Sequence, residues 1–203
     1  DHAEFSPSSL KYVAECSGYI GREGTSEAAE KGTRIHEALE VRDPSALHNE
    51  EEVSIYNKII EEETNFINSF VSGGKFEEIN EICVDVELNG TATWGTCDRL
   101  ILIEDSNKAI LADYKTGISV IDPPEDNWQA KAYTIGVFQK YPELQEITFV
   151  FYIPIRNEVL TGVFKRDNLP ELIEELSKVI KKGEEVRPKW ESGAPSLTEL
   201  TPT

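Results

Sequence analysis

The sequence predicts an α/β fold in which helices flank a central mixed β-sheet. Apolar residues recur at helical spacing in the first third of the chain, most clearly over residues 50–71. Alternating and continuous apolar segments between residues 79 and 115 are instead typical of strands, and short turns separate them. A helix pattern and two more strand patterns follow, which is the order of elements expected for a mixed sheet within one layered domain.

Three helices are predicted before the sheet. Ser6 is suited to cap the first helix, and Pro7 fits its first position, where the amide hydrogen that proline lacks would have no partner. Asp43-Pro44 ends the second helix, because the residue before a proline disfavours helical backbone. Thr25 or Ser26 is suited to cap that helix. The three predicted helices span about 7–16, 27–41 and 50–71.

The remaining segments form the predicted sheet and its two helices. Asn89-Gly90 is typical of a tight hairpin turn between the first two strands. The predicted strands are 79–88, 94–104, 108–115, 146–154 and 158–165, and the predicted helices are 127–140 and 169–182. We therefore expect one domain over 1–183, made of N-terminal helices (6–71) and a sheet with its helices (79–183). A tail or linker over 184–203 would follow it.

Composition limits the classes of function. With 38 acidic residues against 20 lysines and arginines, the net charge is −18. This argues against tight coating of duplex DNA, because phosphate contacts need basic residues, but it leaves open a local groove in which a metal ion offsets carboxylates. No apolar run approaches the roughly 18 residues of a membrane helix. The three widely spaced cysteines favour a reducing, cytoplasmic location.

Two carboxylates and a lysine at neighbouring strand ends give the strongest chemical signal. Asp113 and Lys115 are two residues apart at the end of a predicted strand, so their side chains point to the same face. Asp98 belongs to the preceding strand. Two carboxylates can bind Mg²⁺ or Mn²⁺, which activates a water, and the lysine can stabilise charge that develops at phosphorus. In so charged a chain, however, Asp-x-Lys also occurs by chance at solvated strand ends.

Two predicted helices carry polar pairs that could reach this position. His36 and Glu40 share one helix face, and either could add a metal ligand, although a histidine beside an apolar stripe is more often structural. Gln129 and Tyr133 share a face of the helix that follows the Asp-x-Lys strand. They could contact a phosphate or orient the lysine, and the alternative is a surface pair with a core tyrosine.

One predicted strand could supply a further carboxylate. Glu81, Asp85 and Glu87 share one face of strand 79–88, and Glu87 lies nearest the turn. We therefore take Glu87 as the additional candidate, with a solvated strand face as the alternative. Cys97 points away from its neighbour Asp98 and is expected to be a small core residue.

Taken in chain order, four motifs resemble those of a known superfamily. They are Gly32-x-x-x-His36, Gly95-Thr96-Cys97-Asp98, Asp113-Tyr114-Lys115-Thr116-Gly117 and Gln129-x-x-x-Tyr133. They resemble the RecB-like branch of the PD-(D/E)XK nuclease superfamily, and within it the phage-type and CRISPR-adaptation-type exonucleases. The resemblance covers about residues 5–165 and implies a restriction-endonuclease-like core.

The resemblance implies a metal-dependent deoxyribonuclease that degrades linear DNA from its ends with Mg²⁺ or Mn²⁺. It would act in recombination, repair or phage DNA processing, in the cytoplasm of a bacterium or an infected host and away from membranes. A recombination or single-strand-binding protein would be its partner, and the oligomeric state stays open. The implied catalytic residues are Asp98, Asp113 and Lys115; the metal ligands are His36, Asp98, Asp113 and the backbone carbonyl of Tyr114; and the substrate-binding residues are Gln129 and Tyr133.

The cysteines depart from the pattern of that branch. Many relatives hold a 4Fe–4S cluster with one cysteine near the N-terminus and three near the C-terminus. Cys16 fits the first position, but residues 166–203 contain no cysteine. Either this member lacks the cluster or the chain ends before the other ligands, and we expect no cluster in the present chain.

Two other classes of function remain open. A catalytically silent member of the same fold, which binds DNA or protein, would suit the acidity, but the intact set of histidine, two aspartates and lysine opposes it. An acidic DNA mimic would explain the net charge of −18. It would not require the four motifs in this order.

Overall fold

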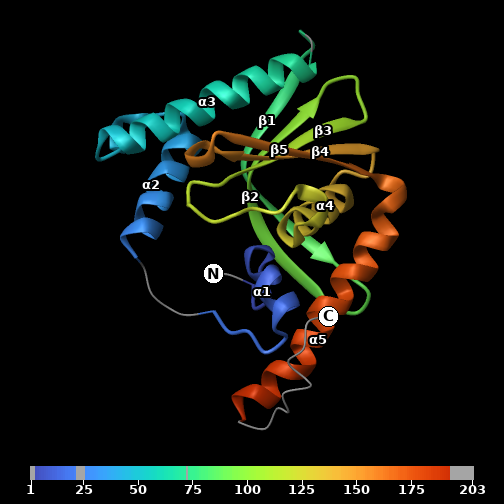
Figure 1. Cartoon of the computed structure of the whole chain (residues 1–203). Helices are drawn as coiled ribbons and strands as arrows, with labels where there is room; N and C mark the ends of the chain where they lie inside the picture. The colour runs from blue at the N-terminus through green and yellow to red at the C-terminus, as the bar shows by residue number, and fades with distance from the viewer. Residues whose placement is uncertain (1–2, 22–25, 72, 193–203) are drawn as a thin grey trace.

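The centre of the molecule is a five-stranded mixed sheet (Figure 1), seen in a computed structural model that describes residues 3–21, 26–71 and 73–192. The strands are β1 (Phe76–Glu87), β2 (Ala92–Ile103), β3 (Lys108–Tyr114), β4 (Glu146–Ile153) and β5 (Glu158–Lys165). They lie side by side in chain order. Neighbours are antiparallel except β3 and β4, which are parallel. The predicted α/β fold with a mixed sheet is confirmed.

Helices cover both faces of this sheet (Figure 1). They are α1 (Leu10–Glu15), α2 (Glu27–Val41), α3 (Glu50–Val71), α4 (Trp128–Lys140) and α5 (Leu169–Glu191), with a 3₁₀ turn, η1 (Pro7–Ser9), before α1. Helices α2 and α3 bury one apolar core against the sheet, and α1, α4 and α5 bury another on the opposite face. None of the helices in the described ranges combines the length and apolar composition needed to cross a bilayer.

Strand β3 is buried on both faces, and this fixes which way its polar end points. Leu111 packs in the core beneath α4, and Ile110 and Tyr114 pack in the core beneath α2 and α3. Because successive side chains of a strand alternate between faces, Asp113 lies on the α4 face. One strand therefore presents a carboxylate to one layer of helices and a tyrosine to the other.

Two predicted element boundaries need correction, and one is confirmed. Helix α5 continues to Glu191 rather than ending near 182, so residues 184–191 are helical and not part of a tail. The buried face also continues, since Val186 and Arg187 are covered, and Arg187 donates a hydrogen bond to the Tyr19 carbonyl at 2.8 Å. Residues 193–203 of the predicted tail lie outside the described residues, as does Thr25. Ser26 caps α2 by accepting a hydrogen bond from the Ala29 amide at 3.2 Å.

Ser6, in contrast, makes no side-chain cap on the helix that it precedes, and that helix begins as the 3₁₀ turn η1 before α1. Its hydroxyl instead donates to Ser9 at 3.2 Å.

Candidate active site

The site begins where strands β2 and β3 stop pairing. Their ladder ends at Arg99 and Ala112, and one residue further on, Asp98 Oδ2 accepts a hydrogen bond from the Tyr114 amide at 2.5 Å. A carboxylate thus takes the place of a backbone partner. Cys97, the neighbour of Asp98, is fully buried in the core, as predicted.

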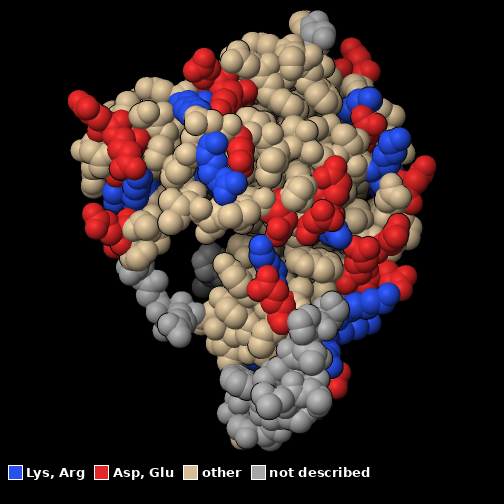
Figure 2. Space-filling view, in the orientation of Figure 1, with Lys and Arg blue, Asp and Glu red and all other residues tan. Residues whose placement is uncertain are grey.

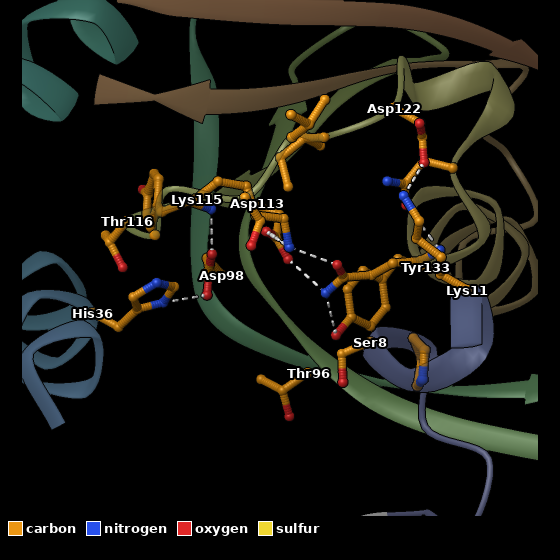
Figure 3. A pocket seen from close by; sticks show the side chains of 18 of the residues that line it. Ser8, Lys11, His36, Thr96, Asp98, Asp113, Lys115, Thr116, Asp122 and Tyr133 are labelled. Carbon is orange, nitrogen blue, oxygen red and sulfur yellow. Dashed lines mark hydrogen bonds and ion pairs between the residues drawn. The ribbon is translucent and has the colours of Figure 1, made fainter. Parts of the chain in front are cut away.

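Helix α2 brings His36 to this carboxylate (Figure 3). His36 Nδ1 lies 3.0 Å from Asp98 Oδ1. Helix α2 lies close to the loop after β3 at Gly32, where a Cβ would be 3.3 Å from Thr116 Oγ1. Burial lowers the pKa of His36, but the hydrogen bond to Asp98 and the charges of Asp98 and Asp113 outweigh burial, so the pKa is raised.

Asp113 and Lys115 form the second half of the site, on the face of the sheet that α4 covers. Lys115 Nζ lies 2.7 Å from Asp113 Oδ2. Gln129 on α4 joins both residues: its Nε2 donates to Asp113 Oδ1 at 2.9 Å, and its Oε1 accepts from Lys115 Nζ at 2.6 Å. Tyr133, one turn further along α4, has its hydroxyl 3.4 Å from Gln129 Nε2.

The surroundings of Asp113 disfavour its ionised form. The residue is only 5 % exposed. Burial and the negative charge of Asp98 raise its pKa, and the nearby Lys115 ammonium opposes this shift only in part.

The sequence argument chose the wrong acidic residue on β1 as the additional carboxylate. Glu81, and not Glu87, lies at the site: ligand atoms of His36, Glu81 and Asp98 all lie within 4.8 Å of one another. Glu81 has a φ of 47°, in the left-handed region, and no ladder partner, while its neighbours pair with Arg99 and Cys97. This local bulge turns its side chain toward Asp98, which simple alternation along a strand does not predict.

Burial, Asp98 and Glu40 raise the pKa of Glu81 to about 7. Glu40 is therefore near the site, although it lies outside the group of close ligand atoms. Glu87 lies at the far end of β1, where its amide and carbonyl bond to the side chain of Gln139. The proposed role of the Tyr114 carbonyl stays a prediction.

A cleft of about 580 Å³ contains much of the site at one end; its lining includes His36, Asp98, Asp113, Lys115, Gln129 and Tyr133, but not Glu81. The loop after β3 forms another part of its wall, and the N-terminal segment forms the side facing that loop, where Lys11 Nζ lies 2.7 Å from Asp122 Oδ2 (Figure 3). Gly95 lets the N-terminal segment lie this close, because a Cβ there would be 2.9 Å from the ring of Pro7. The sequence argument did not include Lys11 or Asp122.

The charges around the ligand group favour a bound cation. Three carboxylates, Glu81, Asp98 and Asp113, have one lysine among them. The pKa values of Glu81 and Asp113 are raised, so the negative charge of each is less favourable here than in water. Because imidazole and carboxylate oxygens are ligands for divalent metals, the described residues include a group that could hold such an ion.

Comparison with known proteins adds a family and a fold. Residues 2–194 match a family described as proteins of unknown function, DUF2800. The chain belongs to this family. A search of the curated proteins found no match.

Among solved structures, the chain is similar to a crystal structure, at 2.19 Å resolution, of a candidate exonuclease from Eubacterium rectale. The two are 13 % identical, with 94 % of this chain and 82 % of that chain covered and a TM-score of 0.51. At this identity the similarity shows a shared fold. A second structure, SSO0001, is 15 % identical over 84 % of each chain, and its TM-score of 0.31 is too low to indicate a shared fold.

A second charged cluster lies behind the site, against α3, in this DUF2800 protein. Tyr114 connects the two, because its amide bonds to Asp98 and its hydroxyl donates to Glu63 Oε1 at 2.6 Å. Glu63 also forms ion pairs with Arg42 and with Arg99, whose Nε lies 3.1 Å away. We call the set Glu63, Glu78, Arg42, Arg99 and Tyr114 the closed cluster, and the set His36, Glu81, Asp98, Asp113, Lys115 and Gln129 the open cluster.

Proposed function

We propose that this DUF2800 protein is a metal-dependent deoxyribonuclease of the RecB-like PD-(D/E)XK type, which acts as an exonuclease on linear DNA. One observation carries the proposal. Asp98, Asp113 and Lys115 line the same cleft, and His36 and Gln129 from two different helices hydrogen-bond to them there. A solvated strand end would not require such convergence.

The donor set suits a divalent cation. His36, Asp98 and Asp113 would hold Mg²⁺ or Mn²⁺, and Glu81 is a fourth donor that the sequence argument did not select. The excess of carboxylates over cations in the open cluster supports this assignment. When bound, the ion would lower the pKa of a water and polarise the phosphate.

The side chains of the cluster would then orient and stabilise the reacting groups. The oxygen of a water would form a bond to phosphorus while that water gives up one proton, one P–O ester bond would break, and the departing oxygen would take up one proton. The Lys115 ammonium would stabilise the negative charge that grows on the phosphoryl oxygens. Gln129 would position Lys115, because it accepts a hydrogen bond from Nζ while it holds Asp113.

The remaining parts of the proposal concern the substrate and its setting. The fold shared with a candidate exonuclease supports DNA as the substrate. We infer that the domain works on DNA ends in recombination, repair or phage DNA processing within the cytoplasm, with a recombination or single-strand-binding protein as partner.

Digestion of end-labelled linear DNA in Mg²⁺ or Mn²⁺ tests the function. We expect Lys115→Ala to lower the cleavage rate by about 100-fold or more, since a preorganised donor to a developing charge contributes on the order of 10²–10³. Asp113→Ala should abolish cleavage and weaken metal binding. Lys108→Ala is the matched control, because Lys108 lies at the other end of β3 in an exposed ion pair with Glu146.

Cleavage that survives both Asp113→Ala and Lys115→Ala would refute the site assignment. If no DNA is cleaved with either metal, the second candidate, a catalytically silent module that binds DNA or protein, replaces the enzyme. The net charge of −18 favours that candidate.

A further inference from the structure

Exposed apolar side chains line the same cleft as Asp98 and Asp113. Tyr12 on α1 lines the cleft and is 48 % exposed, and its ring is stacked on that of Tyr19, with centroids 5.0 Å apart and an angle of 26° between the planes. Val120, in the loop after β3, also lines the cleft and is 68 % exposed. We call Tyr12, Tyr19 and Val120 the rim patch.

An ion pair connects the two segments that carry the rim patch. Lys11, next to Tyr12, forms an ion pair at 2.7 Å with Asp122, two residues after Val120. The same loop carries Ile118, which is 83 % exposed. Large apolar side chains at the edge of a polar cleft are typical of a surface that a ligand covers.

The cleft offers little positive charge to hold that ligand. Its two lysines, Lys11 and Lys115, are each paired with an aspartate. Acidic side chains gather over α2, α3 and α5 (Figure 2), and the chain carries a net charge of −18. Contacts to phosphates therefore supply less affinity than they do in basic nucleases. Stacking of bases on aromatic rings supplies about 1–3 kcal/mol per base and needs no positive charge.

We propose that the rim patch is a stacking site for the unpaired bases of a DNA strand whose backbone lies at the open cluster. The inference rests on the proposed nuclease function and specifies its substrate. The two faces of a base are covered in a duplex by the neighbouring pairs, so a stacking site on the cleft wall selects single-stranded DNA or a single-stranded end. Tyr19 stacks on one face of the Tyr12 ring, and Tyr12 is still 48 % exposed.

Binding can be measured separately from cleavage, with the full chain in EDTA and fluorescently labelled probes of one length. The probes are single-stranded oligothymidylate, a duplex, and a strand with the same phosphates but abasic tetrahydrofuran residues. We expect the wild type to bind oligothymidylate tightest. Tyr12→Ala should weaken that binding about tenfold and leave binding of the abasic strand unchanged. Tyr12→Phe should retain the wild-type affinity.

Two exposed valines provide a matched pair that does not disturb the tyrosine stack. Val120→Ser should weaken oligothymidylate binding, whereas Val163→Ser, an equivalent change on β5 where Val163 is 51 % exposed, should leave binding unchanged. Thermal unfolding of each variant identifies loss of fold.

Several outcomes would overturn the inference. Equal affinity for the abasic strand and oligothymidylate would do so, and so would a preference for the duplex. Unchanged DNA binding in Tyr12→Ala would also overturn it, and this is the result expected if the rim patch binds a protein instead. If Lys115→Ala abolishes cleavage while Tyr12→Ala changes neither binding nor KM, the stacking site is wrong and the nuclease function stands. If binding depends on Tyr12 but no DNA is cleaved, the nuclease function is wrong and the stacking site stands.

Discussion

The open and closed clusters are built on the same three strands, β1, β2 and β3, but balance their charges differently. The closed cluster pairs Glu63 and Glu78 with Arg42 and Arg99, so two negative charges meet two positive ones. The open cluster sets three carboxylates against Lys115 and a histidine. Glu63 and Arg99 of the closed cluster are buried beside a cavity of about 380 Å³, whereas most of the open cluster lines the cleft of about 580 Å³.

This difference separates a structural role from a chemical one. Buried charges with a full set of partners fix the positions of the elements that carry them, and removing one partner leaves another charge uncompensated. A cluster with too many carboxylates is destabilising until a cation arrives, which is a common property of functional sites. Tyr114 joins the two, since the closed cluster holds its ring and the open cluster uses its amide.

The largest effect on stability is expected from Glu63→Ala in the closed cluster. It would leave the nearly buried Arg99 and the half-buried Arg42 without their shared carboxylate, at a cost of about 3–5 kcal/mol in the free energy of unfolding. Denaturant unfolding measures this. Glu158→Ala is the control, because its pair with Arg156 is exposed and contributes about 0–1 kcal/mol. Equal losses in both variants would contradict the structural role of the closed cluster.

The next effect concerns the tyrosine that joins the clusters. Tyr114→Phe removes a hydrogen bond to a carboxylate and should lower the free energy of unfolding by about 1.5–3 kcal/mol. Tyr152→Phe is a matched control on the adjacent strand, since the Tyr152 hydroxyl is buried with no hydrogen-bond partner among the described residues. Denaturant unfolding should show Tyr152→Phe to be neutral or stabilising, and a loss equal to that of Tyr114→Phe would contradict this account.

A smaller effect on stability is expected when the open cluster loses a carboxylate. Asp113→Asn gives up the ion pair with Lys115 but also the repulsion from Asp98, so in EDTA its free energy of unfolding should stay within about 1 kcal/mol of wild type. Added Mn²⁺ should raise the melting temperature of the wild type and not of Asp113→Asn. Asp85→Asn, an exposed acid on β1, should keep the full response to Mn²⁺.

The sequence predicted the fold and most of the open cluster, because both depend on local patterns. Alternation and turn residues give the strands, and the motif spacing puts Asp113 and Lys115 on one face of β3. The choice of Glu87 over Glu81 failed for a physical reason. Glu81 reaches the site through a left-handed backbone conformation that no glycine or asparagine at that position signals.

The closed cluster could not be predicted for a different reason. Its members come from α2, α3, β1, β2 and β3, and each is an ordinary charged residue in its own segment. Only packing brings Glu63 to Tyr114, 51 residues apart in the chain. The rim patch could not be predicted from the sequence either, since nothing near Tyr12 indicates that the loop after β3 lines the same cleft.

The smallest expected effect is a change in how stability depends on pH, because the Glu81 side chain is exposed and water screens much of its interaction with the other charges. The folded pKa of Glu81 is about 7, against an unfolded value of about 4.3, so the folded state binds more protons between these values. Stability without metal should therefore fall as the pH rises from about 5 to 8, because Glu81 must ionise beside Asp98. The raised pKa of His36 acts in the same direction, since a charged histidine is lost as the pH rises.

Glu81→Gln should flatten this fall, because the amide does not ionise, and Glu87→Gln, on the same strand but away from the site, should leave it unchanged. Urea unfolding at pH 5, 6, 7 and 8 in EDTA measures the slope for the three proteins. A divalent ion should oppose the fall in the wild type, because it neutralises the same carboxylates that protons neutralise at low pH. If Glu81→Gln and Glu87→Gln give the same slope, Glu81 is not part of the open cluster, and His36, Asp98 and Asp113 remain as the ligand set.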